Sequence, residues 1–312
     1  MQSRKKPIVV VGSINVDFVV TAQRIPIAGE TIQGKDFQQH FGGKGANQAV
    51  AVARLGYPVE LIGRVGSDAL GEQARESLRS HGVNVEAVEV AEGSSGVAII
   101  TVACDGQNTI VISPGANALL TPAYLCKYEE MIKNAGAVLS QLEIPMETVV
   151  SLADLCERYR VPLILDPAPA QPLPPDLLPK LAWFTPNETE ANFFAKSIDP
   201  GLSIAEPERV AKVLLQTGVG AVALKLGGKG VLIALRDGSA TMLPAQVVDV
   251  VDTTAAGDAF NGAFATGLML GTSPENAAAF ACSAAAISVT RRGAQPSMPS
   301  REEVEGHEEV RP

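Results

Sequence analysis

Short apolar runs alternate with longer amphipathic segments along most of the chain. The first run, residues 8–11, is typical of a central parallel strand that is buried on both faces. We predict further strands at 59–65, 138–142, 163–166, 183–185, 221–226 and 230–235, and helices between them, among them 68–80, 148–158 and 277–289. Alternation of strands and helices predicts an α/β fold with a mostly parallel sheet.

Two stretches depart from this alternation. Residues 18–41 and 85–112 contain short β-like segments with glycine turns, the latter at 85–90, 97–103 and 109–112. We expect a small sheet beside a sugar-sized cleft, with residues 18–41 and 97–112 acting as its lid. Exposed strands often pair with a second copy, so a homodimer through the lid strands is expected. No linker or repeat divides the chain, which predicts a single domain over residues 1–312.

Composition narrows the class of protein. The chain has 312 residues, 46% of them hydrophobic, and a net charge of −9, which suits a globular protein. The absence of a basic stripe argues against nucleic-acid binding, and the apolar stretch at 277–289 is too short to span a membrane. The four cysteines are widely spaced and match no disulfide or zinc pattern. We expect a cytoplasmic protein.

The segment 247–262 passes from apolar residues through small ones into an apolar helix. We predict a strand at 247–251 and a helix that Asp258 opens. Thr253 and Thr254 are residue types that cap helices. A carboxylate at a helix start is equally explained as a first-turn residue that favours the helix dipole.

Three residues in this segment have almost no side chain: Ala255, Ala256 and Gly257. A ligand can therefore approach their backbone N–H groups, and several such groups at the positive end of a helix form an anion site. Asp258 beside an anion site suits a base that accepts a proton from an attacking hydroxyl. Phosphoryl transfer to an alcohol needs this arrangement.

Polar and glycine residues follow the first strand and precede the first helix. Asn15 and Asp17 are two positions apart, so in an extended chain both point to one side and could grip vicinal hydroxyls, although an Asx turn explains them as well. The loop 42–48 is glycine-rich and contains Lys44. It matches neither the Walker A motif nor G-x-G-x-x-G, so the two commonest nucleotide signatures are absent.

Two features lie nearer the C-terminus. Asn187 and Glu190 are three apart, hence neighbours on one helical face, and a capping pair is the simplest explanation. Residues 301–310 are predominantly polar and we expect them to be frayed, while 306–312 lack the pattern of a final helix.

Six motifs in chain order resemble the ribokinase family, which belongs to the phosphofructokinase-B superfamily of sugar and nucleoside kinases. They are Gly-Ser-Ile-Asn-Val-Asp (12–17), Gly-Gly-Lys-Gly-Ala-Asn-Gln-Ala (42–49), Gln-Leu-Glu (141–143), Pro-Asn-Glu-Thr-Glu (186–190), Asp-Thr-Thr-Ala-Ala-Gly-Asp (252–258) and Thr-Arg-Arg-Gly-Ala-Gln (290–295). The resemblance covers essentially the whole chain, and the order of six motifs makes it specific.

The resemblance implies a three-layer α/β/α sandwich with a mostly parallel central sheet and a small β-sheet lid. It implies ATP-dependent phosphorylation of D-ribose at the 5-hydroxyl, which gives D-ribose 5-phosphate and ADP. Carried over by position, Asp258 is the catalytic base, and the N–H groups of Ala255, Ala256 and Gly257 form the anion hole.

The resemblance also implies binding residues. Those that match sugar contacts are Asn15, Asp17, Gly42, Gly43, Lys44, Asn47, Glu143 and Asp258, and those that match nucleotide contacts are Asn187, Lys225, Gly227, Gly228, Gly230, Gly257 and Cys282. Glu190 matches a position that binds Mg²⁺ through water. Asp252, Thr254, Ser288, Arg291, Gly293 and Ser297 match a site for K⁺ as activating cation. Lys225 departs from the Ser or Thr that is common at its position.

Three alternatives stay open. A sibling kinase would act on deoxyribose, another pentose or a nucleoside. A nucleoside acceptor would need an apolar or aromatic slot for its base, and the aromatic content is only 4%. A non-catalytic sugar or nucleotide sensor would not need both Asp258 and the small residues before it. A dehydrogenase would need G-x-G-x-x-G after the first strand, which is absent.

Overall fold

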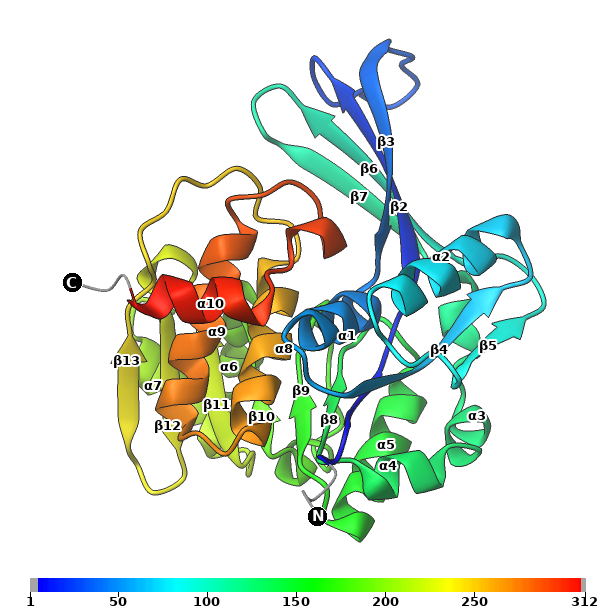
Figure 1. Ribbon diagram of the computed structural model, residues 1–312. Helices are drawn as coiled ribbons and strands as arrows, with labels where there is room; N and C mark the ends of the chain where they lie inside the picture. Colours follow the sequence, from blue (N-terminus) through cyan, green and yellow to red (C-terminus); the bar gives the residue numbers. More distant parts are fainter. Residues whose placement is uncertain (1–4, 310–312) are drawn as a thin grey trace.

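A nine-stranded sheet forms the centre of the molecule in the computed structural model, which describes residues 5–309 and the side chains of 5–307 (Figure 1). Its strands, in spatial order, are β13 (Ala240–Leu243), β12 (Val231–Leu235), β11 (Ala221–Lys225), β10 (Trp183–Phe184), β9 (Leu163–Leu165), β8 (Ala137–Ser140), β1 (Ile8–Val11), β4 (Val59–Gly66) and β5 (Val88–Ala91). Pairing is parallel from β11 through β5, and only β12 and β13 run antiparallel to their neighbours.

Helices cover both faces of this sheet. They are α1 (Lys44–Arg54), α2 (Ala69–Ser80), α3 (Pro122–Cys126), α4 (Glu129–Asn134), α5 (Met146–Tyr159), α6 (Glu188–Ile198), α7 (Pro207–Leu215), α8 (Ala256–Met269), α9 (Pro274–Ser288) and α10 (Arg301–Glu309). None of the described helices is long and apolar enough to cross a membrane.

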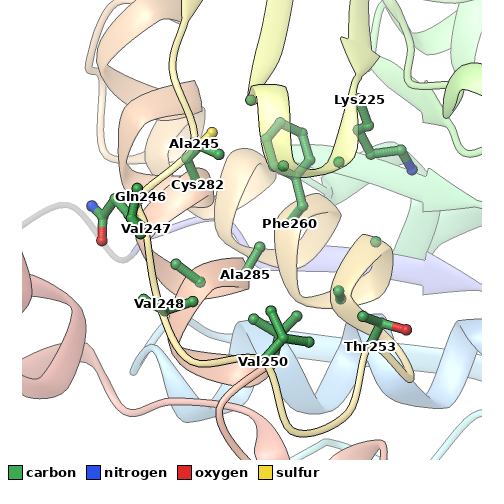
Figure 2. Close-up of a pocket in the computed structure, with 17 residues that line it drawn as sticks. Lys225, Ala245, Gln246, Val247, Val248, Val250, Thr253, Phe260, Cys282 and Ala285 are labelled. Carbon is green, nitrogen blue, oxygen red and sulfur yellow. The ribbon is translucent and has the colours of Figure 1, made fainter.

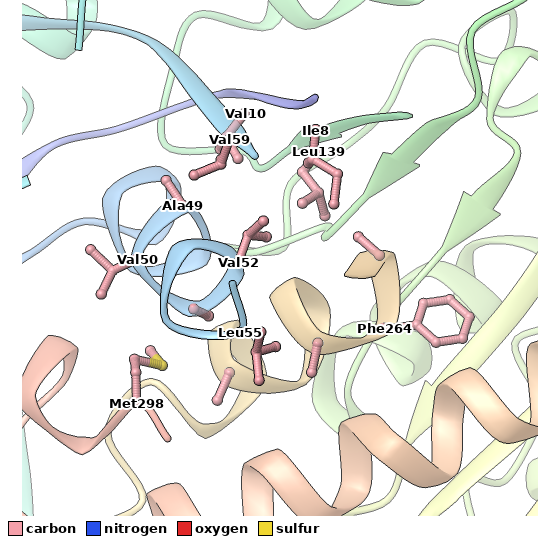
Figure 3. Close-up of a cluster of buried hydrophobic side chains, with 14 of the residues drawn as sticks. Ile8, Val10, Ala49, Val50, Val52, Leu55, Val59, Leu139, Phe264 and Met298 are labelled. Carbon is pink, nitrogen blue, oxygen red and sulfur yellow. The ribbon is translucent and has the colours of Figure 1, made fainter. Parts of the chain in front are cut away.

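Two hydrophobic cores result, one on each face of the sheet. Alternate residues of a strand point to opposite faces, so Ile8 and Val10 pack against α1, α8 and α9, while Val9 and Val11 pack against α3 to α7. Figure 3 shows the first core, where Val52 of α1 and Phe264 of α8 lie beneath the sheet. The expected three-layer α/β/α sandwich with a mostly parallel sheet is therefore confirmed.

A four-stranded sheet projects from the body, in the order β3 (Gly34–Gly42), β2 (Asn15–Ala22), β6 (Gly96–Ala103) and β7 (Asn108–Ser113) (Figure 1). Its strands overlap the segments 18–41 and 85–112 that we expected to form the small sheet, but β2 begins at Asn15, β3 ends at Gly42 and β7 ends at Ser113. The segment 85–90, which we expected in the same patch, is different. Part of it belongs to β5, which pairs in parallel with β4 at the edge of the large sheet.

Two further expectations were wrong. Residues 247–251 form no strand: the chain leaves β13 at Leu243, and Val247, Val248 and Val250 line a cavity instead of pairing with a neighbouring strand. Residues 301–309 are not frayed but form helix α10. A capping box of Ser300 and Glu303 begins this helix, and Val304 is buried in the hydrophobic core. Residues 310–312 lie outside the described residues.

Candidate active site

The carboxyl ends of the parallel strands bring polar residues to one edge of the sheet. Glu143 follows β8, Asp166 follows β9, and Lys225 ends β11. In open α/β sheets this edge is where ligands bind. The loop after β1 leads directly into β2, which starts at Asn15, so the small sheet rises from the same edge.

Glu143 organises the residues next to the first strand. Its Oε2 atom accepts hydrogen bonds from the Ser13 hydroxyl at 2.6 Å, the Lys44 backbone N–H at 3.2 Å and the Asn15 amide at 3.5 Å. The Oδ1 atom of Asn15 accepts from Asn117 Nδ2 at 2.7 Å. Amide and carboxylate groups from three separate segments thus converge at this point.

Asp17 lies beside the glycine-rich loop. A side chain at position 42 would clash with it, because a Cβ atom on Gly42 would lie 2.2 Å from Asp17 Oδ2. Gly43 has a φ of +86°, and a Cβ there would lie 2.6 Å from the Asn15 backbone nitrogen. Glycine is therefore required at both positions by close approach, and at Gly43 also by conformation.

Burial, together with the nearby carboxylates of Glu143 and Asp258, raises the pKa of Asp17 to about 7. Lys44 balances part of this negative charge. Although burial by itself lowers the pKa of Lys44, the carboxylates of Asp258 and Asp166 lead the effects that raise it above its ordinary value. The ammonium group therefore stays charged.

Asp258 is buried at the start of α8, with both carboxylate oxygens held. Asn47 Nδ2 donates to Oδ2 at 2.9 Å, and Gln48 Nε2 donates to Oδ1 at 3.1 Å. The same Gln48 nitrogen also donates to Asp166 Oδ2 at 3.0 Å. Burial raises the pKa of Asp258 to about 6, although Lys44 opposes this shift.

The start of α8 differs from our expectation. The helix begins at Ala256, so Asp258 lies in its first turn but does not open it. Thr253 and Thr254 do not cap it; the Thr254 hydroxyl donates to Asp252 Oδ1 at 2.6 Å instead. The N-cap position is Ala255, in the left-handed conformation, and no described side chain caps the helix.

Two adjacent cavities open at this helix start. One, of about 400 Å³, is lined by Lys44, Asp166, Asn187, Glu188, Glu190, Lys225, Asp258 and the backbone of 255–257, among others. The other, of about 470 Å³, is mostly apolar and lies between the glycine turn after β11 and helices α8 and α9 (Figure 2). Lys225, Gly227, Thr253, Ala256 and Gly257 line both cavities.

The apolar cavity contains most of the residues that match nucleotide contacts. Lys225, Gly227, Gly228, Gly230, Gly257 and Cys282 all line it, and Asn187 lines the polar cavity. Sequence reasoning missed Phe260 and the valines of segment 247–250, which form its other walls (Figure 2). The run of valines was the sequence feature that could have indicated this cavity wall, but it was interpreted as a strand.

Asn187 and Glu190 form the capping box that was the simpler interpretation. Asn187 Oδ1 accepts from the Glu190 N–H at 2.9 Å, and Glu190 Oε2 accepts from the Asn187 N–H at 2.8 Å. Both residues also line the polar cavity. Burial raises the pKa of Glu190, and the neighbouring Asp166 carboxylate raises it further.

The residues that match the cation site lie around Asp252. Its Oδ2 atom accepts from the Gly293 N–H at 2.9 Å, and its Oδ1 atom binds Thr254. These hydrogen bonds lower the pKa of Asp252 below its usual value although burial opposes them. Ser288 and Ser297 are buried. The Ser288 hydroxyl donates to the Ala285 carbonyl, and the Ser297 hydroxyl donates to the Ala294 carbonyl.

Arg291 stands apart from this group, because its guanidinium pairs with Glu303 of α10 at 2.6 Å. Its side chain therefore braces the loop against the last described helix. The described residues include no cluster of three or more His, Cys, Asp or Glu placed to hold a metal ion. Any cation here would be bound mainly by carbonyl oxygens.

Four further residues, which hold the polar side chains of the site, were also not predicted: Asn117, Gln48, Gln141 and Asp166. Asn117 fixes Asn15, while Gln141 Nε2 donates to Gln48 Oε1 at 2.7 Å and so orients the amide that binds Asp166 and Asp258. Gln48 and Gln141 lie inside motifs that the sequence already presented. Asp166, at the end of a buried strand, offered the same positional signal as Glu143.

Comparison with known proteins agrees with this geometry. Residues 5–301 match the model of the pfkB family carbohydrate kinases. The chain belongs to the pfkB family of carbohydrate kinases. Because the match spans nearly the whole chain, the polar and apolar cavities lie within the family domain.

Individual relatives are similar over their full length. A ribokinase of Bacillus subtilis is 43% identical over 301 residues, which cover 96% of this chain and 98% of the relative. A deoxyribokinase of Salmonella typhi is 36% identical, with 95% and 96% covered. The solved structure of Arabidopsis thaliana ribokinase complexed with ribose and ATP superimposes on this kinase with a TM-score of 0.90 and 37% identity, covering 97% of this chain and 99% of that one.

Proposed function

We propose that this protein is a ribokinase, which transfers the γ-phosphoryl group of ATP to the 5-hydroxyl of D-ribose to give D-ribose 5-phosphate and ADP. The observation that carries the proposal is the position of Asp258. Its buried carboxylate lies in the first turn of α8 and lines the polar cavity, and the adjoining Ala256 and Gly257 line both the polar and the apolar cavity. The similarity to ribokinases over the whole chain supports it.

The sugar would bind among Asn15, Asp17, Asn47 and Glu143, against the backbone of Gly42 and Gly43. Vicinal hydroxyls suit paired amide and carboxylate groups, which accept and donate hydrogen bonds in fixed directions. The Oδ1 atom of Asn47 is buried and has no hydrogen-bond partner among the described side chains and backbone. A hydroxyl donor from a sugar would satisfy it, because an unpaired buried acceptor is costly.

The nucleotide would place its base in the apolar cavity and its phosphates in the polar one. The apolar walls offer the area that a flat base needs. The N–H groups of Ala255, Ala256 and Gly257 would bind phosphate oxygens at the positive end of α8. Asn187, Lys44 and Lys225 line the same polar cavity.

In the proposed mechanism Asp258 accepts the proton of the 5-hydroxyl as that oxygen attacks the γ-phosphorus. Asn47 and Gln48 hold the carboxylate in place through its two oxygens. The N–H groups of 255–257 and Lys44 stabilise the charge that develops on the phosphoryl oxygens. Positioning and charge stabilisation account for most of the rate enhancement in reactions of this type.

Divalent magnesium fits the polar cavity. Four carboxylates line it, those of Asp166, Glu188, Glu190 and Asp258, against the two lysines. When bound with ATP, magnesium supplies the positive charge that such a cavity lacks, and it prefers oxygen ligands and retains water. Glu190 is the carboxylate that would hold it through water, while Asn187 keeps Glu190 oriented.

A potassium ion fits the loops around Asp252. The donor set that the resemblance implies would be the Asp252 carboxylate with backbone groups of Thr254, Ser288, Arg291, Gly293 and Ser297, which suits a large monovalent cation. Asp252 already joins the two loops through Gly293 and Thr254. A cation there would order the residues that lead into Ala255.

Product analysis tests the proposal. The protein would be incubated with ATP, magnesium, potassium and D-ribose, and the product followed by phosphorus and proton NMR. We expect a single new phosphomonoester on C5 of ribose and one ADP for each ester. Phosphate on C1, or ATP hydrolysis without an ester, would contradict the proposal.

Deoxyribose is the second candidate acceptor, because a deoxyribokinase is among the relatives at 36% identity. Asp17 and Glu143 favour ribose over deoxyribose. A half-buried carboxylate oxygen that loses its hydroxyl donor is left without a partner, so the analogue lacking that hydroxyl is rejected.

A further inference from the structure

We propose that Lys225 is a phosphate-binding cation that Asp166 holds in readiness, and that Lys225 exchanges this carboxylate for the nucleotide's phosphate groups. The inference rests on the proposed function and adds a residue-level step to it. It concerns how nucleotide phosphates are recognised before any chemistry takes place.

Lys225 and Asp166 form a buried ion pair at the ligand-binding edge of the sheet. The Lys225 Nζ atom lies 2.9 Å from Asp166 Oδ1, and the two side chains are 12% and 3% exposed. They come from the ends of β11 and β9, which lie on either side of β10. The pair therefore spans the strand between them.

The ammonium group lies where the two cavities meet. Lys225 lines both of them, and a Cβ atom on Gly257 would lie only 3.5 Å from its Nζ atom. Figure 2 shows the side chain at the rim of the apolar cavity, with its nitrogen directed away from Val247 and Val248. A nucleotide that spans both cavities must pass this charge.

Stability alone does not account for the pair. A buried ion pair contributes little net stability, because desolvation of both charges offsets their attraction. In a cavity open to ligands the lysine gains a different use: its ammonium can move from a carboxylate to a phosphate and stay paired with an anion, while the Gln48 amide still donates to Asp166. The nearby Lys229, which is exposed and pairs with Glu188, has no such position.

Asp166 is held when the lysine leaves. Its second oxygen, Oδ2, accepts the Gln48 amide at 3.0 Å, and the same amide binds Asp258. The carboxylate therefore keeps its orientation and returns the ammonium to the same place after the nucleotide departs. It also competes with phosphate for the lysine, which limits the affinity for nucleotides.

Isothermal titration calorimetry of the full chain tests the exchange, with ADP and adenosine as probes and with divalent ions and sugar left out. The variants are Asp166→Asn, the double variant Lys225→Met with Asp166→Asn, and Lys229→Met as the matched control. The deciding comparison is between Asp166→Asn and the double variant, because both lack the Asp166 charge and they differ only in the Lys225 ammonium group.

We expect Asp166→Asn to bind ADP more tightly than the unaltered protein. The double variant should bind ADP at least about tenfold more weakly than Asp166→Asn, the loss expected for one charge-assisted hydrogen bond. Adenosine should bind equally to both, which also shows that the double variant is folded. Lys229→Met should leave both affinities unchanged.

Equal ADP affinity in the two variants would overturn the inference, as would an equal loss for ADP and adenosine. If either result is obtained while the unaltered protein binds ATP and phosphorylates ribose, the inference about Lys225 fails but the proposed function is retained. An unaltered protein that binds neither ADP nor ATP would overturn both.

Discussion

At the scale of single residues, the site is organised by carboxylates that sit close together. After burial, the carboxylates of Glu143 and Asp258 raise the pKa of Asp17, and that of Asp166 raises the pKa of Asp258. Such a cluster would repel itself without Lys44, Lys225 and the amides of Asn47 and Gln48 between them. The amides therefore do as much to define the site as the charges.

Replacing the proposed base gives the first prediction. Asp258→Asn keeps the size of the side chain but removes its ability to accept a proton, so kcat should fall at least about a hundredfold. The affinity for ATP should be unchanged, measured by calorimetry. Near-normal turnover would remove Asp258 as the base.

The pH dependence of kcat/KM for ribose gives the second. Both Asp17 and Asp258 have raised pKa values, about 7 and about 6, and both must be ionised to bind a hydroxyl or accept its proton. Protonation occurs as pH falls through these values. We therefore expect a plateau above the higher pKa and a loss of roughly tenfold per pH unit or more below the lower one.

A steady-state series in buffers of constant ionic strength measures this profile. A flat profile between pH 5 and pH 8 would contradict the assigned environment of both carboxylates. Glu190→Gln is a useful comparison, since burial also raises the pKa of Glu190 but Glu190 is not proposed to accept a proton in the reaction.

How much of the site the sequence could predict depends on where each signal lies. Asn47 and Asp258 each lie inside a contiguous motif, and both were predicted. The structure brings these two residues within hydrogen-bond distance of each other. Asp166 and Asn117 were missed, because each acts through a partner far away in sequence. A single sequence gives no measure of such partnerships.

At the scale of elements, apolar character alone misassigned one segment. The segment 247–251 is rich in valine, as strands are, but Val247, Val248 and Val250 line a cavity. The backbone N–H groups of Val251 and Asp252 donate to the Val289 carbonyl. Strand propensity reflects a fit to half-buried surfaces in general. Conversely, α10 was missed because Val304 is the single buried side chain among its residues 301–307, and its capping box went unrecognised.

The two loops joined by Asp252 give the third prediction. If potassium orders them, the rate should be higher with potassium than with sodium at equal ionic strength, because the N–H groups at the start of α8 depend on the same segment. Asp252→Asn should lose this difference. Equal rates with either ion in the unaltered protein would sink the cation-site assignment.

At the scale of the whole molecule, the layers could be predicted from periodicity, and the small sheet from its break in that pattern. The outer parts of the small sheet expose large apolar side chains, among them Phe37, Ile99, Ile110 and Val111. Exposed apolar strands favour pairing with a second copy. The lid and the homodimer through it stay predictions, which hydrogen exchange on adding ribose and a solution mass measurement would test.

The most direct test of the central claim compares acceptors in one assay. ADP release from ATP would be measured with magnesium and potassium, across D-ribose, 2-deoxyribose, arabinose, fructose and adenosine, each as kcat/KM. The account predicts that ribose exceeds every other acceptor by at least about a hundredfold, because the half-buried carboxylates of Asp17 and Glu143 disfavour an acceptor that lacks the hydroxyl they bind. A higher kcat/KM for another acceptor, or no turnover with any of them despite ATP binding, would contradict it.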